Sequence, residues 1–363
     1  MKEIRFISYL FLINLVIIDI KCISNQNNSY NIYNNFNDYS YSHTHCLIHL
    51  SINNYNNIFG NFEFCRKCDK KNEEQQSKIK NCEKCMNWEI LTELTIISPE
   101  ETLNEILNNN KSISRYGDGE FDLLFGSSIG FQKVDKILSK RLSDILQSND
   151  EGLLIGIPDI LNMNNLYKFM DGCQKFWTNW HKKRVFKLVL ALNENKTYYS
   201  SFMTRFYILY RDQSKVPKYI EKLKQIWNKR DVVIIEGEKS RLGVNNDLFN
   251  NVKSIQRILC PFINAFNIYE KILKEALQIE KNKLILLALG PTATILAYDL
   301  YHAGYQVIDI GHADIEYEWF LRNATRAIKI PYKYVYEAKN GTRDIEKVIE
   351  KEYYNQIIKK ILN

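Results

Sequence analysis

The stretch Leu284-Ile-Leu-Leu-Ala-Leu289, followed by Gly290-Pro-Thr-Ala and later by Val307-Ile-Asp-Ile310 and Gly311, decides the fold. Short apolar runs that end at a glycine are typical of strands buried on both faces. The residues between the two runs, 292–303, have the pattern of a helix. A strand, a glycine turn, a helix and a second strand form the unit of a parallel sheet.

The same alternation extends outward from this stretch. We predict further strands at 153–157, 186–192 and 232–236, and further helices at 133–147, 217–229 and 267–278. The sequence therefore predicts an α/β fold with a Rossmann-like, doubly wound parallel sheet over residues 93–363. Ligands of such sheets bind at the carboxyl ends of the strands, so the polar residues that follow each strand are the functional candidates.

Composition and charge exclude some classes of protein. The chain has 363 residues, of which 45% are hydrophobic and 25% charged, which is ample for a large α/β core. The net charge of +7 is compatible with an anionic ligand such as a nucleotide diphosphate. The basic residues are spread along the chain with no arginine-rich tract, which argues against nucleic acid as the partner.

The N-terminus has the layout of a signal peptide over residues 1–24, with Lys2 and Arg5 before an apolar run at 6–20. The run is short for a membrane span, so a signal anchor is the lesser alternative. We expect a protein of the ER or Golgi lumen, or a secreted one, with no stable membrane span. Five asparagines have the glycosylation pattern: Asn27, Asn110, Asn195, Asn323 and Asn340.

Two segments separate this leader from the α/β body. Residues 25–60 are rich in Asn, Tyr and Ser and are predicted to be a disordered, low-complexity stem. Residues 61–92 are a small cysteine-rich clip with two CxxC pairs: Cys65 with Cys68, and Cys82 with Cys85. Four thiolates at this spacing suit a zinc site, whereas an oxidising compartment favours two disulfides.

Asp118 and Glu120 flank Gly119 in a turn that we predict between a strand and a helix. Two carboxylates at this spacing can converge on one Mn²⁺ or Mg²⁺ ion, which prefers oxygen ligands and can bridge a diphosphate. Taken alone, the pair is better explained without a metal, as the acidic first turn of a helix.

Three further polar segments follow predicted strands. The first runs from Glu236-Gly237 through Arg241 and Gly243 to Asn246-Asp247, and suits a loop that faces a phosphate or a sugar. The second, Gly290-Pro291-Thr292, can bind an anion at the start of a helix. The third contains Asp309, His312, Asp314 and Glu316, a density of carboxylates that requires a shared cation.

Taken in order, these motifs resemble the GT-D glycosyltransferase family, known from bacterial glycosylation of surface adhesins. The resemblance runs from about Glu93 to Glu337 and rests on the following segments: Arg115-Tyr-Gly-Asp-Gly-Glu120, Phe202-Met-Thr-Arg205, Glu236-Gly with Arg241 and Gly243, Asn246-Asp-Leu-Phe249, Arg257-Ile-Leu-Cys-Pro261 with Asn264-Ala-Phe266, Gly290-Pro-Thr-Ala293, Asp309-Ile-Gly-His312, Glu316-Tyr-Glu-Trp319 and Lys333-Tyr-Val335. One departure lies in the loop, where Asn245 stands at a position expected to be glycine.

The resemblance implies a metal-dependent enzyme that moves a hexose, with glucose expected, from a UDP-sugar to a glycan or glycoprotein acceptor. It assigns the Asp-x-Glu metal signature to Asp118 and Glu120. It implies that the donor is held by the following residues: Arg115, Arg205, Arg241, Asn246, Asp247, Gly290, Pro291 and Thr292. A catalytic base is expected in the cluster from Asp309 to Glu316, with Glu236 as a second candidate.

Three other functions compete with this one, and one of them is a zinc-dependent protein with the two CxxC pairs as its functional centre. A catalytically inactive GT-D-fold module that binds a sugar or nucleotide is the main alternative, and the intact Asp-x-Glu pair argues against it. A nicotinamide-dependent oxidoreductase is disfavoured, because no predicted strand is followed by a GxGxxG turn.

Overall fold

The computed structural model describes residues 3–7, 17–21, 91, 93–339, 341, 345–347 and 351–362. The chain divides into two units, Met1–Trp88 and Glu89–Asn363. In the first, β1 (Glu3–Ile7) and β2 (Ile17–Lys21) pair antiparallel. The predicted stem and the four cysteines of the clip lie outside the described residues.

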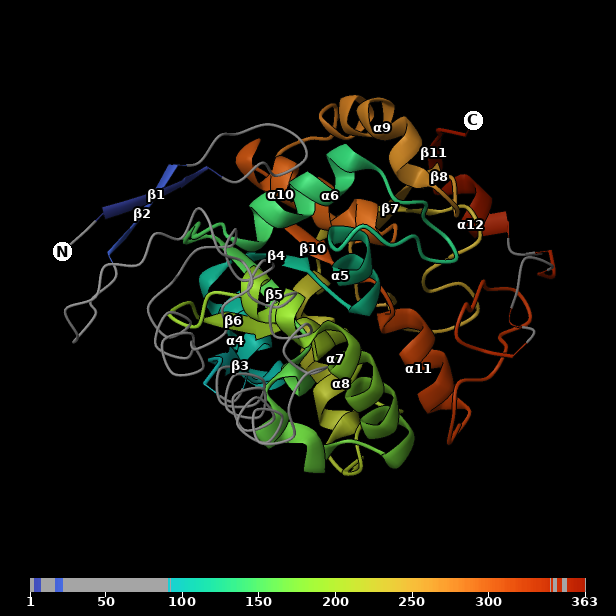
Figure 1. Ribbon diagram of the computed structural model, residues 1–363. Coiled ribbons are helices and arrows are strands. Elements are labelled where there is room, and N and C mark those ends of the chain that lie inside the picture. Colours follow the sequence, from blue (N-terminus) through green and yellow to red (C-terminus); the bar gives the residue numbers. More distant parts are fainter. Residues whose placement is uncertain are drawn as a thin grey trace. The chain divides into compact units, whose positions relative to one another are not determined.

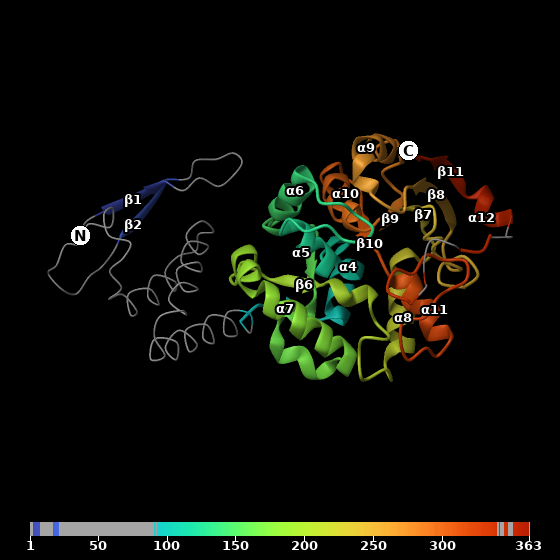
Figure 2. The same cartoon turned by 45° about the vertical axis from the view of Figure 1, so that its right-hand side comes forward.

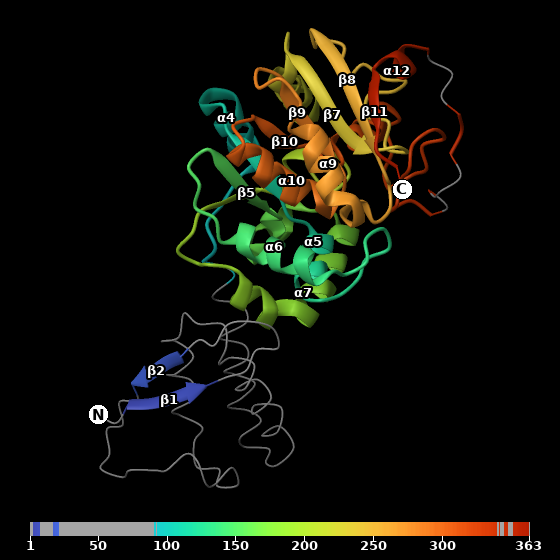
Figure 3. The same cartoon turned by 90° about the horizontal axis from the view of Figure 1, so that it is seen from above.

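The second unit is built on one parallel sheet. Its strands lie in the order β11-β8-β7-β9-β10-β4-β5-β6-β3, and every neighbouring pair is parallel. Figure 3 shows β9, β7, β8 and β11 side by side. The strand bounds are β3 (Ile96–Ile97), β4 (Ser112–Arg115), β5 (Leu153–Ile157), β6 (Tyr198–Ser200), β7 (Asp231–Gly237), β8 (Ser254–Cys260), β9 (Leu284–Ala288), β10 (Val307–Asp309) and β11 (Ile357–Lys360).

Helices lie between successive strands of this sheet, except between β7 and β8 (Figure 1). The α-helices are α4 (Pro99–Asn109), α5 (Asp118–Leu124), α6 (Lys136–Leu146), α7 (Asp171–Ala191), α8 (Val216–Lys224), α9 (Tyr269–Ala276), α10 (Pro291–His302), α11 (Ala313–Leu321) and α12 (Lys351–Asn355). Short 3-10 turns are η1 (Asp159–Leu161), η2 (Met163–Lys168), η3 (Ser201–Thr204), η4 (Gln225–Trp227) and η5 (Ala265–Ile268). In the described part of the chain, none of the helices is long and apolar enough to cross a membrane.

Successive residues of each central strand enter two separate hydrophobic cores. In β9, Ile285 and Leu287 pack with α5, α6, α7, α9 and α10, whereas Leu284 and Leu286 pack with α4, α8 and α11. Side chains alternate between the faces of a strand, so a continuous apolar run is buried on both sides only when helices cover both faces. Figure 2 shows α9 and α10 on one side of the strands and α8 and α11 on the other. The predicted doubly wound α/β fold is confirmed.

The centre of the sheet is the point where the strand order reverses. Strand β4 lies beside β10, and the chain passes from β4 to β5 on one side, whereas β10 is reached from β9 on the other. The connections that follow β4 and β10 therefore diverge. The carboxyl ends of these two strands border the crevice in which ligands of open α/β sheets bind.

One predicted strand is wrong. Residues 186–192 form the end of α7 and its cap instead of a strand. Val185, Leu188 and Leu192 are buried at helical spacing and join Trp177 and Trp180 in the core. A short apolar run fits a buried helix as well as a strand, and the 21-residue length of α7 decides for the helix. The strand in this part of the chain is β6.

Candidate active site

Four of the predicted site residues lie at the carboxyl ends of three adjacent strands. Arg115 is the last residue of β4 and Asp309 the last residue of β10, next to it in the sheet. Asp118 begins α5 directly after β4, and Gly290 follows β9. The fold therefore assembles one polar site from motifs that are far apart in the sequence.

The Asp-x-Glu pair begins a helix, as predicted. Gly117 is the N-cap of α5, and its backbone N–H donates to Glu120 Oε2 at 2.7 Å. The helix is fixed from outside by Asp122, which accepts from Arg184 Nη2 at 2.9 Å and from Trp180 Nε1 at 3.2 Å. The two carboxylates are thus held on a short, anchored helix at the edge of the crevice.

The surroundings of this pair oppose its ionisation. Burial raises the pKa of Glu120 to about 7, with a further rise from the neighbouring Asp309 and Asp118 carboxylates. Burial also raises the pKa of Asp118, although the Arg205 guanidinium partly offsets this. Desolvated carboxylates that repel one another gain most from a nearby cation.

The two carboxylates fit a divalent ion only together with a ligand. Among the described residues, no group of three or more His, Cys, Asp and Glu side chains is arranged to hold a metal. Mg²⁺ and similar ions are commonly bound by one or two carboxylates together with substrate phosphate oxygens and water. Asp118 and Glu120 match that donor set, and the remaining ligands would come from the substrate.

Arg115 ties the two central strands together. It donates from Nε to the Asp309 carbonyl oxygen at 2.6 Å and from Nη2 to Asp309 Oδ1 at 2.9 Å. Its Nη1 donates to Thr204 Oγ1 at 2.5 Å and to the Ser201 carbonyl oxygen at 2.9 Å. The Arg115 and Asp309 side chains are only 10% and 6% exposed, so these two predicted site residues form the floor of the site.

Gly311 is required beside this pair. Its φ is +42°, and a Cβ at this position would lie 1.8 Å from Arg115 Nη2. We predict that Gly311→Ala lowers the free energy of unfolding by about 1–2 kcal/mol from backbone strain. A further loss of about 1.5–3 kcal/mol should follow from the disturbed charged hydrogen bond. Urea unfolding measures both together.

Gly304 provides the matched control for this substitution. Its φ is +87°, and a Cβ added at this glycine would have no other atom within 4 Å, so Gly304→Ala carries strain without the collision. The difference between the two variants isolates the Arg115 contact. Equal losses of unfolding free energy in both variants would show that the Arg115 guanidinium moves aside without an energetic penalty.

A second ionic cluster lies beside the Asp118–Glu120 pair and joins three parts of the chain. Glu337 Oε1 lies 2.7 Å from Arg205 Nη2 and 2.6 Å from His312 Nε2. Although burial opposes ionisation, the facing His312 and Arg205 hold the pKa of Glu337 well below its usual range. The predicted residues Arg205 and His312 are therefore brought together by a carboxylate that carried no predicted role.

Glu316 lies beneath this cluster, with no exposed side-chain surface. Its Oε2 accepts from the backbone N–H groups of Tyr207 (3.0 Å) and Ile208 (3.1 Å), and its Oε1 is 3.8 Å from Arg205 Nη1. Burial raises the pKa of Glu316 to about 7. These contacts fix the segment after η3 and leave the carboxylate inaccessible to an acceptor.

The Gly290 turn has the features of an anion site. Gly290 has φ +54° and is the N-cap of α10, in which Pro291 and Thr292 are the first two residues. Thr292 Oγ1 is buried and has no hydrogen-bond partner among the described residues. An unpaired buried hydroxyl at a helix N-terminus is suited to a phosphate oxygen.

The loop after β7 is held from below by a buried ion pair. Glu236 Oε1 lies 2.6 Å from Arg257 Nη1, and Glu236 Oε2 accepts from Leu242 N–H at 2.8 Å. Arg241 donates to the backbone carbonyls of Tyr332 and Glu346. Asn245 has φ +60°, in agreement with the glycine-like conformation expected at this position. Through these contacts, Glu236 and Arg241 both help to hold the loop in place.

A buried network joins the same loop to α11. Lys333 Nζ lies 2.7 Å from Asp314 Oδ2 and 2.9 Å from Glu318 Oε1, and its side chain is fully buried. Asn246 Nδ2 donates to both carboxylates, at 2.8 Å and 2.7 Å. Lys333 is a cation shared by Asp314 and Glu318, whereas Asp309 and Glu316 of the predicted cluster lie beside Arg115 and Arg205. Asp314 and Asn246, both predicted site residues, are therefore hydrogen-bonded to each other.

Asp247 lies apart from these groups. It accepts from Tyr317 OH at 2.5 Å and pairs with Lys224 Nζ at 3.2 Å, next to the end of α8. Asp247 was predicted to hold the sugar donor. Because α8 leads into the amino end of β7, Asp247 is not brought together with Asp118 and Gly290, which follow the carboxyl ends of their strands.

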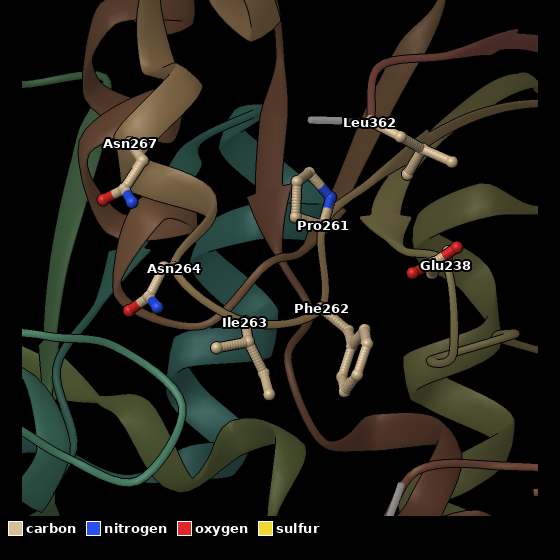
Figure 4. A pocket seen from close by; sticks show the side chains of 7 residues that line it. All are labelled: Glu238, Pro261, Phe262, Ile263, Asn264, Asn267 and Leu362. Atoms are coloured by element: carbon tan, nitrogen blue, oxygen red, sulfur yellow. The ribbon is translucent and has the colours of Figure 1, made fainter. Parts of the chain in front are cut away.

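A pocket of about 430 Å³ lies beyond the carboxyl ends of β7, β8 and β11 (Figure 4). Its lining combines apolar and hydrogen-bonding side chains: Glu238, Pro261, Phe262, Ile263, Asn264, Asn267 and Leu362. Asn264 donates from its backbone N–H to the Phe131 carbonyl oxygen at 2.8 Å. Phe131 also approaches Gly290, so this pocket borders the Gly290 turn.

Sequence reasoning missed Glu337, Lys333 and Thr204 as members of these clusters. Glu337 and Arg205 are 132 residues apart, and no motif surrounds Glu337 to mark it. Lys333 had two signals, which were its place in the Lys333-Tyr-Val335 segment of the resemblance and the need for a cation among the carboxylates. Thr204 lies in the Phe202–Arg205 motif, but its partner is Arg115, which is 89 residues away in the sequence.

The sequence profile of the family described as "Glycosyltransferase GT-D fold" matches residues 113–338, the region that carries this site. The chain therefore belongs to the GT-D fold glycosyltransferases.

Particular relatives agree with this class. Glycosyltransferase GlyD of Streptococcus pneumoniae serotype 4 (strain ATCC BAA-334 / TIGR4) is 39% identical over 265 residues, which are 73% of this chain and 32% of that protein. A probable glycosyl transferase, Gly, of Streptococcus gordonii is 38% identical over 73% of this chain and 39% of its own length. The chain thus spans a third to two fifths of these two relatives.

A solved structure shares the fold along almost its whole length. It is described as a new glycosyltransferase (DUF1792) from Streptococcus sanguinis, and it aligns with a TM-score of 0.71 at 38% identity. The alignment covers 74% of this chain and 99% of that one.

Proposed function

We propose that this chain transfers a hexose, with glucose expected, from a UDP-sugar to a hydroxyl of a glycan or glycoprotein, with the aid of Mn²⁺ or Mg²⁺. One observation carries the proposal: Asp118 and Glu120, two desolvated carboxylates, stand at the same sheet edge as the Gly290 turn with its unpaired Thr292 hydroxyl. A metal and a diphosphate complement each other at such an edge.

The residues divide the proposed work as follows. Asp118 and Glu120 would hold the ion, which would neutralise charge on the departing diphosphate. The α10 N-terminus and Thr292 would orient the phosphates, and Arg205 adds a positive charge close to Asp118. Arg115 and Asp309 support this arrangement from the floor of the site.

The test is release of UDP from a panel of UDP-sugars by the full chain, with GDP-mannose as the unrelated donor. We predict slow hydrolysis of one UDP-sugar that requires Mn²⁺ or Mg²⁺ and stops with EDTA. Because water replaces the acceptor in this assay, the acceptor need not be known.

The outcomes separate the two functions considered for this fold. Metal-dependent release from one UDP-sugar, without release from GDP-mannose, supports the transferase. Binding of UDP without any release would favour the inactive binding module. Neither binding nor release by folded protein would overturn the proposed donor class.

We also propose a lumenal or secreted location. The three glycosylation motifs within the described residues lie at exposed asparagines, Asn110, Asn195 and Asn323, as attachment of an oligosaccharide requires. Loss of mass on enzymatic removal of N-linked glycans is the measurement for this proposal.

A further inference from the structure

Most carboxylates of the site are unavailable as a catalytic base. Asp309 is paired with Arg115, Asp314 with Lys333, and Glu236 with Arg257, and none of these three carboxylates has more than 6% of its side chain exposed. Glu316 has no exposed side-chain surface, and its Oε2 accepts two backbone N–H groups. A base that takes a proton from an incoming hydroxyl must be within hydrogen-bond reach of it.

His312 meets this requirement. It follows Gly311 at the end of β10 and is the N-cap of α11, and 36% of its side chain is exposed. Its Nε2 lies 2.6 Å from Glu337 Oε1. Its Nδ1 has no hydrogen-bond partner among the described residues, so one nitrogen is held by a carboxylate and the other is free to accept a proton.

Glu337 is suited to hold the ring in this state. Arg205 Nη2, at 2.7 Å from the same Oε1, keeps the carboxylate ionised and in place. An ionised carboxylate beside Nε2 favours the tautomer with the proton on Nε2, which leaves Nδ1 as the basic nitrogen. It also stabilises the imidazolium that forms when Nδ1 is protonated.

We propose that His312 and Glu337 form the proton-accepting dyad of the transferase, with His312 as the catalytic base and Glu337 as its positioning residue. This rests on the proposed function. The acceptor oxygen forms a bond to the anomeric carbon while the bond from that carbon to the phosphate oxygen breaks. The hydroxyl proton passes to Nδ1, and the electron pair of the broken bond leaves with UDP. The anomeric configuration is therefore inverted.

The dyad lies in the electrostatic field of Asp118 and Glu120, the pair proposed to hold the metal. Arg205 and Glu316 face it from the end of η3 and from α11, and Asp309 and Asp118 contribute from β10 and the start of α5. These four groups also influence any pH dependence of the dyad. A variant of Glu337 must therefore be compared with a carboxylate variant that leaves all four unchanged.

The experiment uses the full chain, the UDP-α-sugar that the panel identifies, and water as the acceptor. Proton NMR directly after mixing should show the β-anomer of the released hexose. We predict that His312→Gln lowers kcat about 10²–10⁴-fold with little change in KM for the donor. Release of the α-anomer, or a kcat of His312→Gln within threefold of wild type, would overturn the proposal.

Glu337→Gln separates positioning from a structural role. We expect a loss in kcat of about tenfold or more and a shift of the acidic limb of kcat against pH to lower pH, because the protonated imidazole loses its facing negative charge. Glu337→Asp should restore part of the rate. The matched control is Glu280→Gln, which removes an exposed carboxylate paired with Lys283.

The outcomes of the Glu337 series are distinguishable from failure of the proposed function. An unchanged pH profile in Glu337→Gln, with wild type active, would show that Glu337 only supports the fold. No UDP release by wild type with any donor would instead remove the reaction on which the dyad depends.

Discussion

Asp118→Asn is expected to lower metal-dependent UDP release by about a thousandfold. A bound divalent ion contributes several kcal/mol to stabilisation of charge in the transition state, and each 1.36 kcal/mol is tenfold in rate. The variant should also lose the increase in melting temperature that Mn²⁺ together with UDP gives the wild type. Both are measured on the full chain, by UDP release and by thermal unfolding.

The fold should survive this substitution. Burial raises the pKa of Asp118, so its negative charge is unfavourable in the folded, metal-free protein, and the neutral amide should leave stability unchanged or slightly higher. Asp171→Asn is the matched control, because Asp171 is likewise the first residue of a helix but is 89% exposed. Turnover of Asp118→Asn within tenfold of wild type would exclude a metal role for this residue.

Lys333→Met is expected to lower the free energy of unfolding by about 3–5 kcal/mol. Lys333 is fully buried between Asp314 and Glu318, whose side chains are 2% and 1% exposed. Removal of one partner from a buried ion pair leaves uncompensated charge in a medium that solvates it poorly. Here two neighbouring carboxylates lose their cation, so urea unfolding should give a loss of free energy near the upper end of this range.

Two comparisons make this result specific. Lys253→Met removes an exposed lysine paired with Asp231, and it should cost no more than about 1 kcal/mol. Adding Asp314→Asn to Lys333→Met removes one of the stranded charges and should recover part of the loss. If Lys333→Met behaves like Lys253→Met, the buried network does not contribute to stability as inferred.

The fold was largely predictable because its central strands are buried on both faces. β5, β7, β9 and β10 are continuous apolar runs that end at proline, glycine or a site residue, and each was located within a residue or two. Strands β6 and β8 and the two edge strands, β3 and β11, were not among the predicted ones. β3 has two residues and β6 three, β8 is buried only over its second half, and β11 has exposed side chains, so none of them carries a continuous buried run of the predicted kind.

The site was predictable as far as sequence neighbours define it. Asp118 and Glu120 share one turn, and Gly290 to Thr292 another, so their placement at the starts of α5 and α10 follows from local spacing. Which charges neutralise one another depends on the packing of distant segments. No local pattern indicated that Lys333 would take Asp314, or that Glu337 would reach both Arg205 and His312.

The adjacency of β4 and β10 has a consequence for biosynthesis. Ser112 Oγ accepts from Val307 N–H across 195 residues of sequence, so β4 has no partner on that side until β10 has been synthesised. At about 5–20 residues per second, this takes about 10–40 s. During that time β4 is an open strand edge on which other chains can pair. Folding of this sheet is therefore expected to be slow, and dependent on chaperones that shield the nascent half-sheet.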